Sequence, residues 1–359
     1  MKEIIAEKKR KINLDVYRVL LMFFIVIHHS IIYGLNLSDL SSSSYITSSI
    51  SKYLILIDSI VIVGVNGFWI ISGFFLIKYK RNKVISLYLE MMFYVFLGII
   101  IYGFLGKGWS VSSVLKILLP FECYWFMLVY LGLYLVSPFI NMILNKINEK
   151  ELNKYLLFTS IIVFYFGFIR NKAFLGFNGG YSLVQAIYMY FIGYYISVKK
   201  NKIKINKYLS LFAFCIIALI NTTIILVLLK YNKQSLCWKL LSYNNPLIII
   251  QSILLFLFFS HIKLNCRYNN SIYYISSSTL AVYLITESPG LSQLIYIPMK
   301  YFNFSIISIG IIQTILYSIL LFLISIFIDF SRRLIVKSYY KSFGENIKLY
   351  KKKRGFYES

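Results

Sequence analysis

Residues 14–29 read LDVYRVLLMFFIVIHH, and this stretch decides the fold because it places an arginine and histidines inside an apolar run. Arg18 is followed, after ten residues, by His29. A central arginine costs about 2.5–3.5 kcal/mol on bilayer-insertion scales, so ionisable groups within a membrane span are functional by default. At about 100° per residue, eleven helical steps return His29 to within roughly 20° of the face of Arg18, about 16 Å further along the axis. The sequence therefore predicts a membrane helix with two functional groups on one face.

The composition of the whole chain is that of a membrane protein. Of its 359 residues, 59% are hydrophobic and 14% are charged, whereas a soluble domain carries roughly 25% charged residues. The net charge of +25 does not indicate nucleic-acid binding, because the basic residues lie in the segments that flank the apolar runs. The four cysteines are scattered without paired spacing, so they predict neither a metal site nor a disulfide framework.

Apolar runs long enough to span a bilayer recur along the chain and predict an all-α, polytopic transmembrane bundle of about ten spans. Lys and Arg concentrate in the segments that would be cytoplasmic if both termini lie inside, as the positive-inside rule requires. We expect a basic cytoplasmic N-terminus (1–11), a membrane domain (12–330) in the cytoplasmic membrane, and a basic tail (331–359) against anionic lipid. The expected spans are 13–35, 53–77, 84–105, 121–144, 155–170, 181–198, 207–229, 246–262, 272–293 and 304–330.

Several segments beyond the first span carry distinctive motifs. They are Gly64–Leu76 (GVNGFWIISGFFL), Trp125–Pro138 (WFMLVYLGLYLVSP), Gly180–Tyr195, Tyr243–Pro246 (YNNP) and Tyr283–Glu287 (YLITE). In this order, and together with the Arg18-x10-His29 pair, they resemble the acyltransferase-3 family of integral membrane acyltransferases. Two positions depart from that pattern. Thr286 stands where many relatives have histidine. Many relatives also have an Arg-x-x-Arg pair thought to meet the acyl donor, where this chain offers only Lys78-x-x-Arg81 or Lys80-x-x-Lys83. Lysine keeps the charge but loses the bidentate fork that suits phosphate.

The resemblance implies that the chain transfers an acyl group, most simply acetyl from acetyl-CoA, to a hydroxyl of a cell-surface glycan or lipid-linked saccharide. Membrane lipid and polysaccharide-assembly proteins are the further expected partners. The alternative is a carrier or flippase for a lipid-linked saccharide or small anion, because a buried arginine and histidine also suit a substrate site or a proton relay. A membrane glycosyltransferase is disfavoured, since the expected outer loops are short and poor in charge.

Depth along the expected spans sorts the candidate residues into two levels. Arg18, Ser72, Lys78 and Arg81 fall near the inner end, where their cationic character suits the phosphates of acetyl-CoA. Arg18 can also pair with Asp15, three residues earlier on the same helix. Ser72 is more typical of a small residue that lets membrane helices pack closely than of a nucleophile.

The outer level holds His29, Glu287, Trp125 and Glu122. Neutral imidazole is the common general base near pH 7, so His29 can deprotonate a sugar hydroxyl or accept the acyl group transiently. Glu287 either orients this ring, as a carboxylate orients a triad histidine, or is a partly wet carboxylate at a helix end. Trp125 either stacks on a sugar face or belongs to the interfacial aromatic belt. Glu90, in the third span, is left without an assigned partner.

Overall fold

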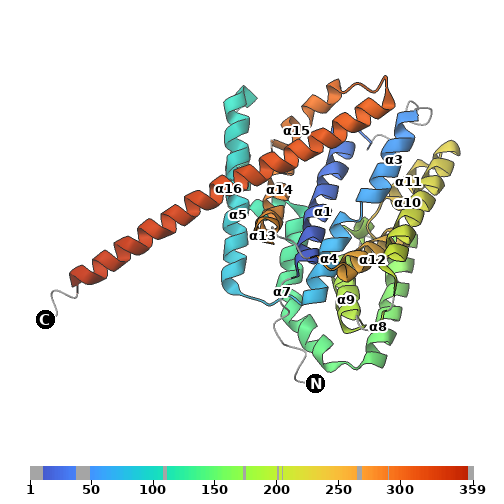
Figure 1. Ribbon diagram of the computed structural model, residues 1–359, viewed down its shortest axis with the longest axis horizontal. Coiled ribbons are helices and arrows are strands. Elements are labelled where there is room, and N and C mark those ends of the chain that lie inside the picture. Colours follow the sequence, from blue (N-terminus) through green and yellow to red (C-terminus); the bar gives the residue numbers. More distant parts are fainter. Residues whose placement is uncertain are drawn as a thin grey trace.

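The computed structural model describes residues 11–37, 49–107, 111–172, 175–199, 202–203, 205–264, 269–289 and 291–354. Within these residues the chain forms helices joined by turns and no strand, which confirms the predicted helical bundle (Figure 1). Seven of the described helical segments are long and apolar enough to cross a membrane, so the chain is a multi-pass membrane protein. Residues 1–10, nearly all of the predicted cytoplasmic N-terminus, lie outside the described residues.

These seven helical segments correspond to seven of the expected spans. They are α1 (Ile12–His29) with the π-helical turn η1 (Ser30–Gly34), α3 (Ser49–Val61) with α4 (Gly64–Phe75), α5 (Arg81–Tyr102), α7 (Trp125–Lys146), α8 (Glu149–Ile162) with η4 (Val163–Ile169), α10 (Lys207–Lys230) and α16 (Ile307–Arg354).

The other three expected spans correspond to shorter elements. They are α9 (Leu183–Lys199), α12 (Pro246–His261), and the pair α13 (Asn269–Ser277) and α14 (Thr279–Thr286), which are separated by a break at Ser278. The total of ten spans and the cytoplasmic location of both termini therefore stay predictions. The remaining short helices include α6 (Val111–Leu118), η3 (Pro120–Cys123), α11 (Gln234–Leu240) and α15 (Leu291–Ile295).

Helix α1 runs through the centre of the bundle (Figure 1) and packs against α3, α4, α12, α13, α14 and α16. Its side chains Leu14, Tyr17 and Leu21 are fully buried. Near its start, the Asn13 side-chain amide donates a hydrogen bond to the backbone carbonyl of Phe259 on α12, at 2.7 Å. Because α1 is enclosed by neighbours, both functional groups predicted from its sequence lie in the protein interior rather than in lipid.

Helices α4 and α9 approach each other closely through glycines. A Cβ added at Gly73 would overlap the backbone carbonyl of Tyr190, and one added at Gly193 would overlap that of Ile70. Such small-residue contacts replace the hydrophobic effect as the basis of helix association in a membrane. The side chain of Asn66 on α4 also donates to the backbone carbonyl of Tyr243, at 2.9 Å, and so ties this helix pair to the loop before α12.

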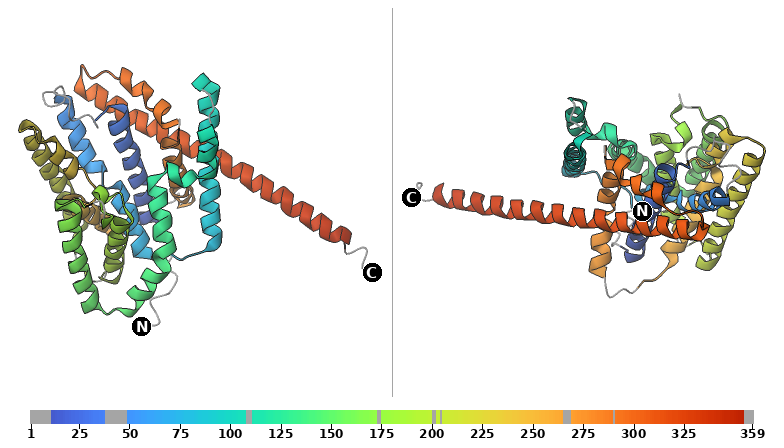
Figure 2. Two further views of the ribbon diagram at one scale, coloured as in Figure 1. Left: turned by 180° about the vertical axis from the view of Figure 1, so that it is seen from behind. Right: turned by 90° about the horizontal axis from the view of Figure 1, so that it is seen from above.

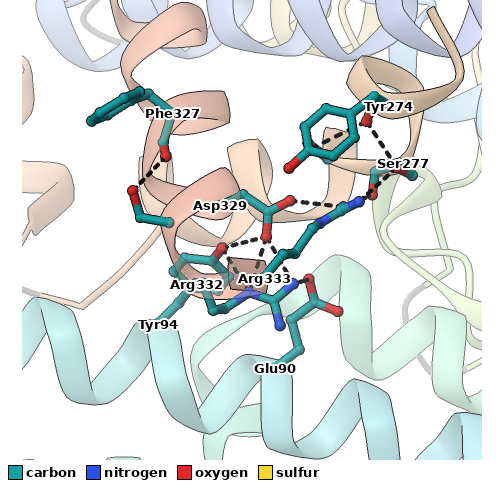
Figure 3. A network of polar contacts seen from close by, with 10 residues as sticks. Glu90, Tyr94, Tyr274, Ser277, Phe327, Asp329, Arg332 and Arg333 are labelled. Carbon is teal, nitrogen blue, oxygen red and sulfur yellow. Dashed lines mark hydrogen bonds and ion pairs between the residues drawn. The ribbon is translucent and has the colours of Figure 1, made fainter. Parts of the chain in front are cut away.

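The C-terminal helix α16 crosses the bundle and then projects well beyond it (Figures 1 and 2). Figure 3 shows how it is anchored: the Arg332 guanidinium contacts Glu90 of α5 at 2.9 Å and Asp329 at 2.7 Å. The Tyr94 hydroxyl donates to Asp329 at 2.9 Å, and Arg333 donates to the Ser277 carbonyl at 2.6 Å. Glu90 therefore has a structural partner, and α16 continues unbroken past residue 330, where the predicted tail begins.

Candidate active site

A cavity of about 690 Å³ lies at the level of Arg18. The names inner and outer that we give to this cavity and the next one follow the predicted topology. Its wall combines aromatic and aliphatic side chains from α4, α7 and α14 with cationic groups. Among the described residues that line it there is no carboxylate, and its charged members are Arg18, Lys78, Lys80 and Lys83. Hydrogen bonds between such cations and phosphate oxygens are charge-assisted and stronger than neutral ones. The cavity therefore has the electrostatic character that a phosphorylated ligand requires.

Arg18 forms the ion pair that its spacing predicts. Its Nη1 lies 2.6 Å from Oδ1 of Asp15, which is buried and also accepts a hydrogen bond from the Ser276 hydroxyl at 3.1 Å. The guanidinium lies 5.6 Å from the centre of the Phe75 ring, and the side chain keeps 27% exposure. Arg18 lines the cavity and Asp15 is not among the described lining residues, so the ion pair can orient the guanidinium at the cavity wall.

The other residues predicted at the inner level divide into two groups. Ser72 and Lys78 line the cavity, but the Ser72 hydroxyl donates to the Phe68 carbonyl of its own helix at 2.9 Å, which favours the packing role. Arg81 is exposed at the start of α5 and is not among the described lining residues. Lys80 and Lys83, which form the alternative Lys-x-x-Lys pair of the sequence, line the cavity.

An outer cavity of about 560 Å³ lies at the level of His29. Trp125 is part of its wall, where the indole stacks at 5.8 Å on the ring of Tyr243 and meets that of Tyr181 at 4.6 Å. Amide side chains surround these rings, namely Asn171, Asn178 and Asn244. Binding pockets are usually lined by aromatic and other apolar side chains together with a few polar groups. Glu122 is exposed on η3 and is not among the described residues lining either cavity.

The structure brings Glu287 to His29. Glu287 follows the end of α14, and its Oε1 lies 3.0 Å from Nδ1 of His29. These two atoms are close enough for a hydrogen bond, but the orientation of the two side chains does not give one. A small rotation of either side chain would complete it. Catalytic hydrogen bonds are often loose before a substrate is bound. The carboxylate is thus in place to fix the tautomer of the ring, and both roles stay predictions.

A second histidine–carboxylate pair lines the same cavity, and the sequence reasoning missed it. Nδ1 of His28 lies 2.5 Å from Oδ1 of Asp58 on α3, and the Asp58 side chain is fully buried. The centres of the His28 and His29 rings are 5.8 Å apart. The available signal was Asp58 itself, a carboxylate within the expected span 53–77, because such a group is costly in a membrane unless it is paired.

Adjacent residues at the start of α7 line different cavities. Trp125 lines the outer cavity, whereas the next residue, Phe126, lines the inner one. The Phe126 ring lies 4.6 Å from that of Trp69 and 5.5 Å from that of Tyr283. Along α1, Arg18 and His29 connect the two levels over about 16 Å. The Trp125 and Phe126 rings lie 6.0 Å apart, so the two cavities approach each other at these two residues.

Comparison with known proteins identifies the family. A family model described as an acyltransferase domain, that of the acyltransferase-3 family, matches residues 11–330. This match covers most of the chain and confirms the resemblance found in its motifs. Searches of curated proteins and of solved structures gave no match.

Proposed function

Because the chain belongs to the acyltransferase-3 family, we propose that it transfers an acetyl group from cytoplasmic acetyl-CoA to a hydroxyl of a cell-surface glycan. It does so from the cytoplasmic membrane, with both termini inside. The observation that carries this proposal is the pair of cavities on α1, a cationic one at Arg18 and an aromatic one at His29. Two chemically different substrates that approach from opposite sides of a membrane require two such sites.

The inner cavity supports the donor assignment. Its four cations, Arg18, Lys78, Lys80 and Lys83, match the phosphates of CoA, and no carboxylate of the described lining residues opposes them. The aromatic and aliphatic remainder of the wall suits the thioester arm, which is long and carries little charge. In this arrangement the phosphates stay near the cytoplasm, and the arm points along α1 toward the ring of Phe126.

The outer cavity supports the glycan assignment. Trp125, Tyr181 and Tyr243 present ring faces, and neighbouring asparagine amides supply hydrogen-bond donors and acceptors. This combination fits a sugar, which has an apolar ring face and polar hydroxyls. His29, held near Glu287, is the group that meets both substrates. It receives the acetyl end from the inner side and faces the acceptor in the outer cavity.

The function is tested by the O-acetyl content of isolated surface glycan, measured by proton NMR in cells with and without the protein. We expect the acetyl signals to disappear without the protein while the amount of surface glycan is unchanged. A fall in surface amount, with acetyl per sugar unaltered, contradicts the proposal and favours a carrier of lipid-linked saccharide.

Replacing Arg18 with glutamine is expected to raise KM for acetyl-CoA about tenfold to a hundredfold with a smaller change in kcat. The reason is the loss of a charge-assisted contact to phosphate, worth about 1.5–3 kcal/mol. For Arg18→Lys we expect a KM between those of the native chain and Arg18→Gln, since lysine keeps the charge but loses the bidentate guanidinium fork. The measurement is steady-state release of free CoA by the purified protein in lipid nanodiscs.

Arg170→Gln is the matched control for this prediction. Arg170 is exposed and is not among the described residues lining either cavity, so its removal deletes the same charge at a different place. Its KM for acetyl-CoA is expected to equal that of the native chain. An unchanged KM in both arginine variants would contradict the donor role of Arg18.

A further inference from the structure

His28 and Asp58 form a buried pair that the proposed reaction does not yet use. Asp58 is fully buried on α3, and its Oδ1 contacts Nδ1 of His28 at 2.5 Å. The second carboxylate oxygen, Oδ2, is buried without a hydrogen-bond partner among the described residues. A half-satisfied buried carboxylate is costly, and a helix contact alone would be made more cheaply by apolar side chains. The pair is therefore better explained by chemistry than by packing.

The geometry of this pair repeats that of His29 and Glu287. Each imidazole turns Nδ1 toward a carboxylate from another helix, α3 for His28 and the end of α14 for His29. In both rings this leaves Nε2 as the nitrogen available to a ligand, and both side chains line the outer cavity. The ring centres are 5.8 Å apart. At this separation, one imidazole can contact one atom of a reacting group while the other imidazole contacts a second atom.

We propose that the two histidines divide the reaction: His29, backed by Glu287, carries the acetyl group, and His28, backed by Asp58, takes the proton of the acceptor hydroxyl. This inference rests on the proposed function. Its logic is that an imidazole whose nitrogen holds the acetyl group cannot also accept a proton there. A second base must therefore face the same cavity, and His28 is in that position.

In the first step, Nε2 of His29 attacks the thioester carbonyl. The C–S bond breaks, and its electron pair leaves with the CoA thiolate, which takes a proton from solvent in the inner cavity. The Nδ1 proton of His29 moves to Glu287, so that a neutral acetyl-imidazole remains. The protonated carboxyl group of Glu287 then lies 3.0 Å from Nδ1 of His29, and a small rotation of either side chain lets it donate a hydrogen bond to that nitrogen.

In the second step, Nε2 of His28 removes the hydroxyl proton of the acceptor, and Asp58 stabilises the imidazolium that forms. The acceptor oxygen attacks the acetyl carbon, and the C–N bond to His29 breaks with its electron pair on the ring. Glu287 returns its proton to Nδ1, which restores neutral His29. His28 then releases its proton to solvent in the outer cavity, and the two half-reactions balance.

The test uses the purified protein in lipid nanodiscs with [14C]acetyl-CoA and two acceptors. One is surface glycan from producing cells, stripped of its esters by mild alkali. The other is hydroxylamine, which is nucleophilic at neutral pH without a general base. For His28→Gln we expect transfer to the glycan to fall at least a hundredfold, with transfer to hydroxylamine within about threefold of the native chain and labelled acetyl retained on the protein.

The remaining variants separate the outcomes. Asp58→Asn keeps the shape of the pair, and we expect it to lose transfer to the glycan selectively, as His28→Gln does, but to a smaller extent. His29→Gln is expected to lose transfer to both acceptors. His261→Gln is the control, because His261 contacts the Leu257 carbonyl and is not among the described residues lining either cavity. If His28→Gln acetylates the glycan at the native rate, or loses both acceptors equally, the division of roles is wrong. If the native protein does not acetylate the glycan at all, it is the proposed function that fails.

Discussion

Cells that carry His29→Gln are expected to show surface glycan with at least a hundredfold less O-acetyl than cells with the native chain. A group that exchanges protons or bonds with the reacting atoms typically contributes about 10²–10⁴-fold to the rate. Glutamine has a similar length, but its amide does not accept a proton near pH 7. It also cannot take up the acetyl group and then depart from it, as an imidazole can. The measurement is proton NMR of the isolated glycan, with protein abundance in the membrane quantified alongside it.

Glu287→Gln is the companion variant, and its expected loss is smaller, about tenfold to a hundredfold. The amide keeps the volume beside His29 but cannot take up the Nδ1 proton, so the ring is held less well in its reactive tautomer. His261→Gln is again the control and should leave O-acetyl content unchanged. If His29→Gln retained more than half of the native O-acetyl content, the catalytic assignment of this residue would be refuted.

The common depth of Glu287 and His29 was predictable because it depends only on helix rise. The first and ninth expected spans run in the same direction, so counting residues at about 1.5 Å each puts both groups at one depth. The structure has them 3.0 Å apart, even though the ninth span is broken between α13 and α14. The Arg18–Asp15 ion pair was predictable for the same reason, since it is local to one helix.

Lateral neighbours were not predictable in this way. Depth does not say which helices touch or how each is rotated, and the partners of Asp58 and Glu90 depend on both. Asp58 meets His28 because α1 packs on α3. Glu90 of α5 meets Arg332 of α16 across 242 residues of sequence. Sequence spacing also did not predict that Arg81 is exposed and is not among the described residues lining the inner cavity.

Replacing Gly73 with leucine is expected to lower the free energy of unfolding by about 3 kcal/mol or more. Inserting atoms into a packed interior typically costs about 1–3 kcal/mol, and more where the surroundings cannot yield. Here the new Cβ would overlap the backbone carbonyl of Tyr190, which is held within α9 and cannot move as a flexible side chain can. The measurement is thermal unfolding in detergent, with the monodisperse fraction followed by size-exclusion chromatography.

Gly132→Ala is the matched control for the close approach of α4 and α9. A Cβ at Gly132 on α7 would lie 3.4 Å from the Leu183 side chain, an ordinary contact, so this variant is expected to unfold like the native chain. The Gly73 variant should also lose activity, because α4 contributes Ser72 to the inner cavity and Asn66 to the support of Tyr243 in the outer one. If Gly73→Leu had native thermal stability, α4 and α9 could separate without a loss of stability. The close contact at Gly73 would then not be what positions the cavities.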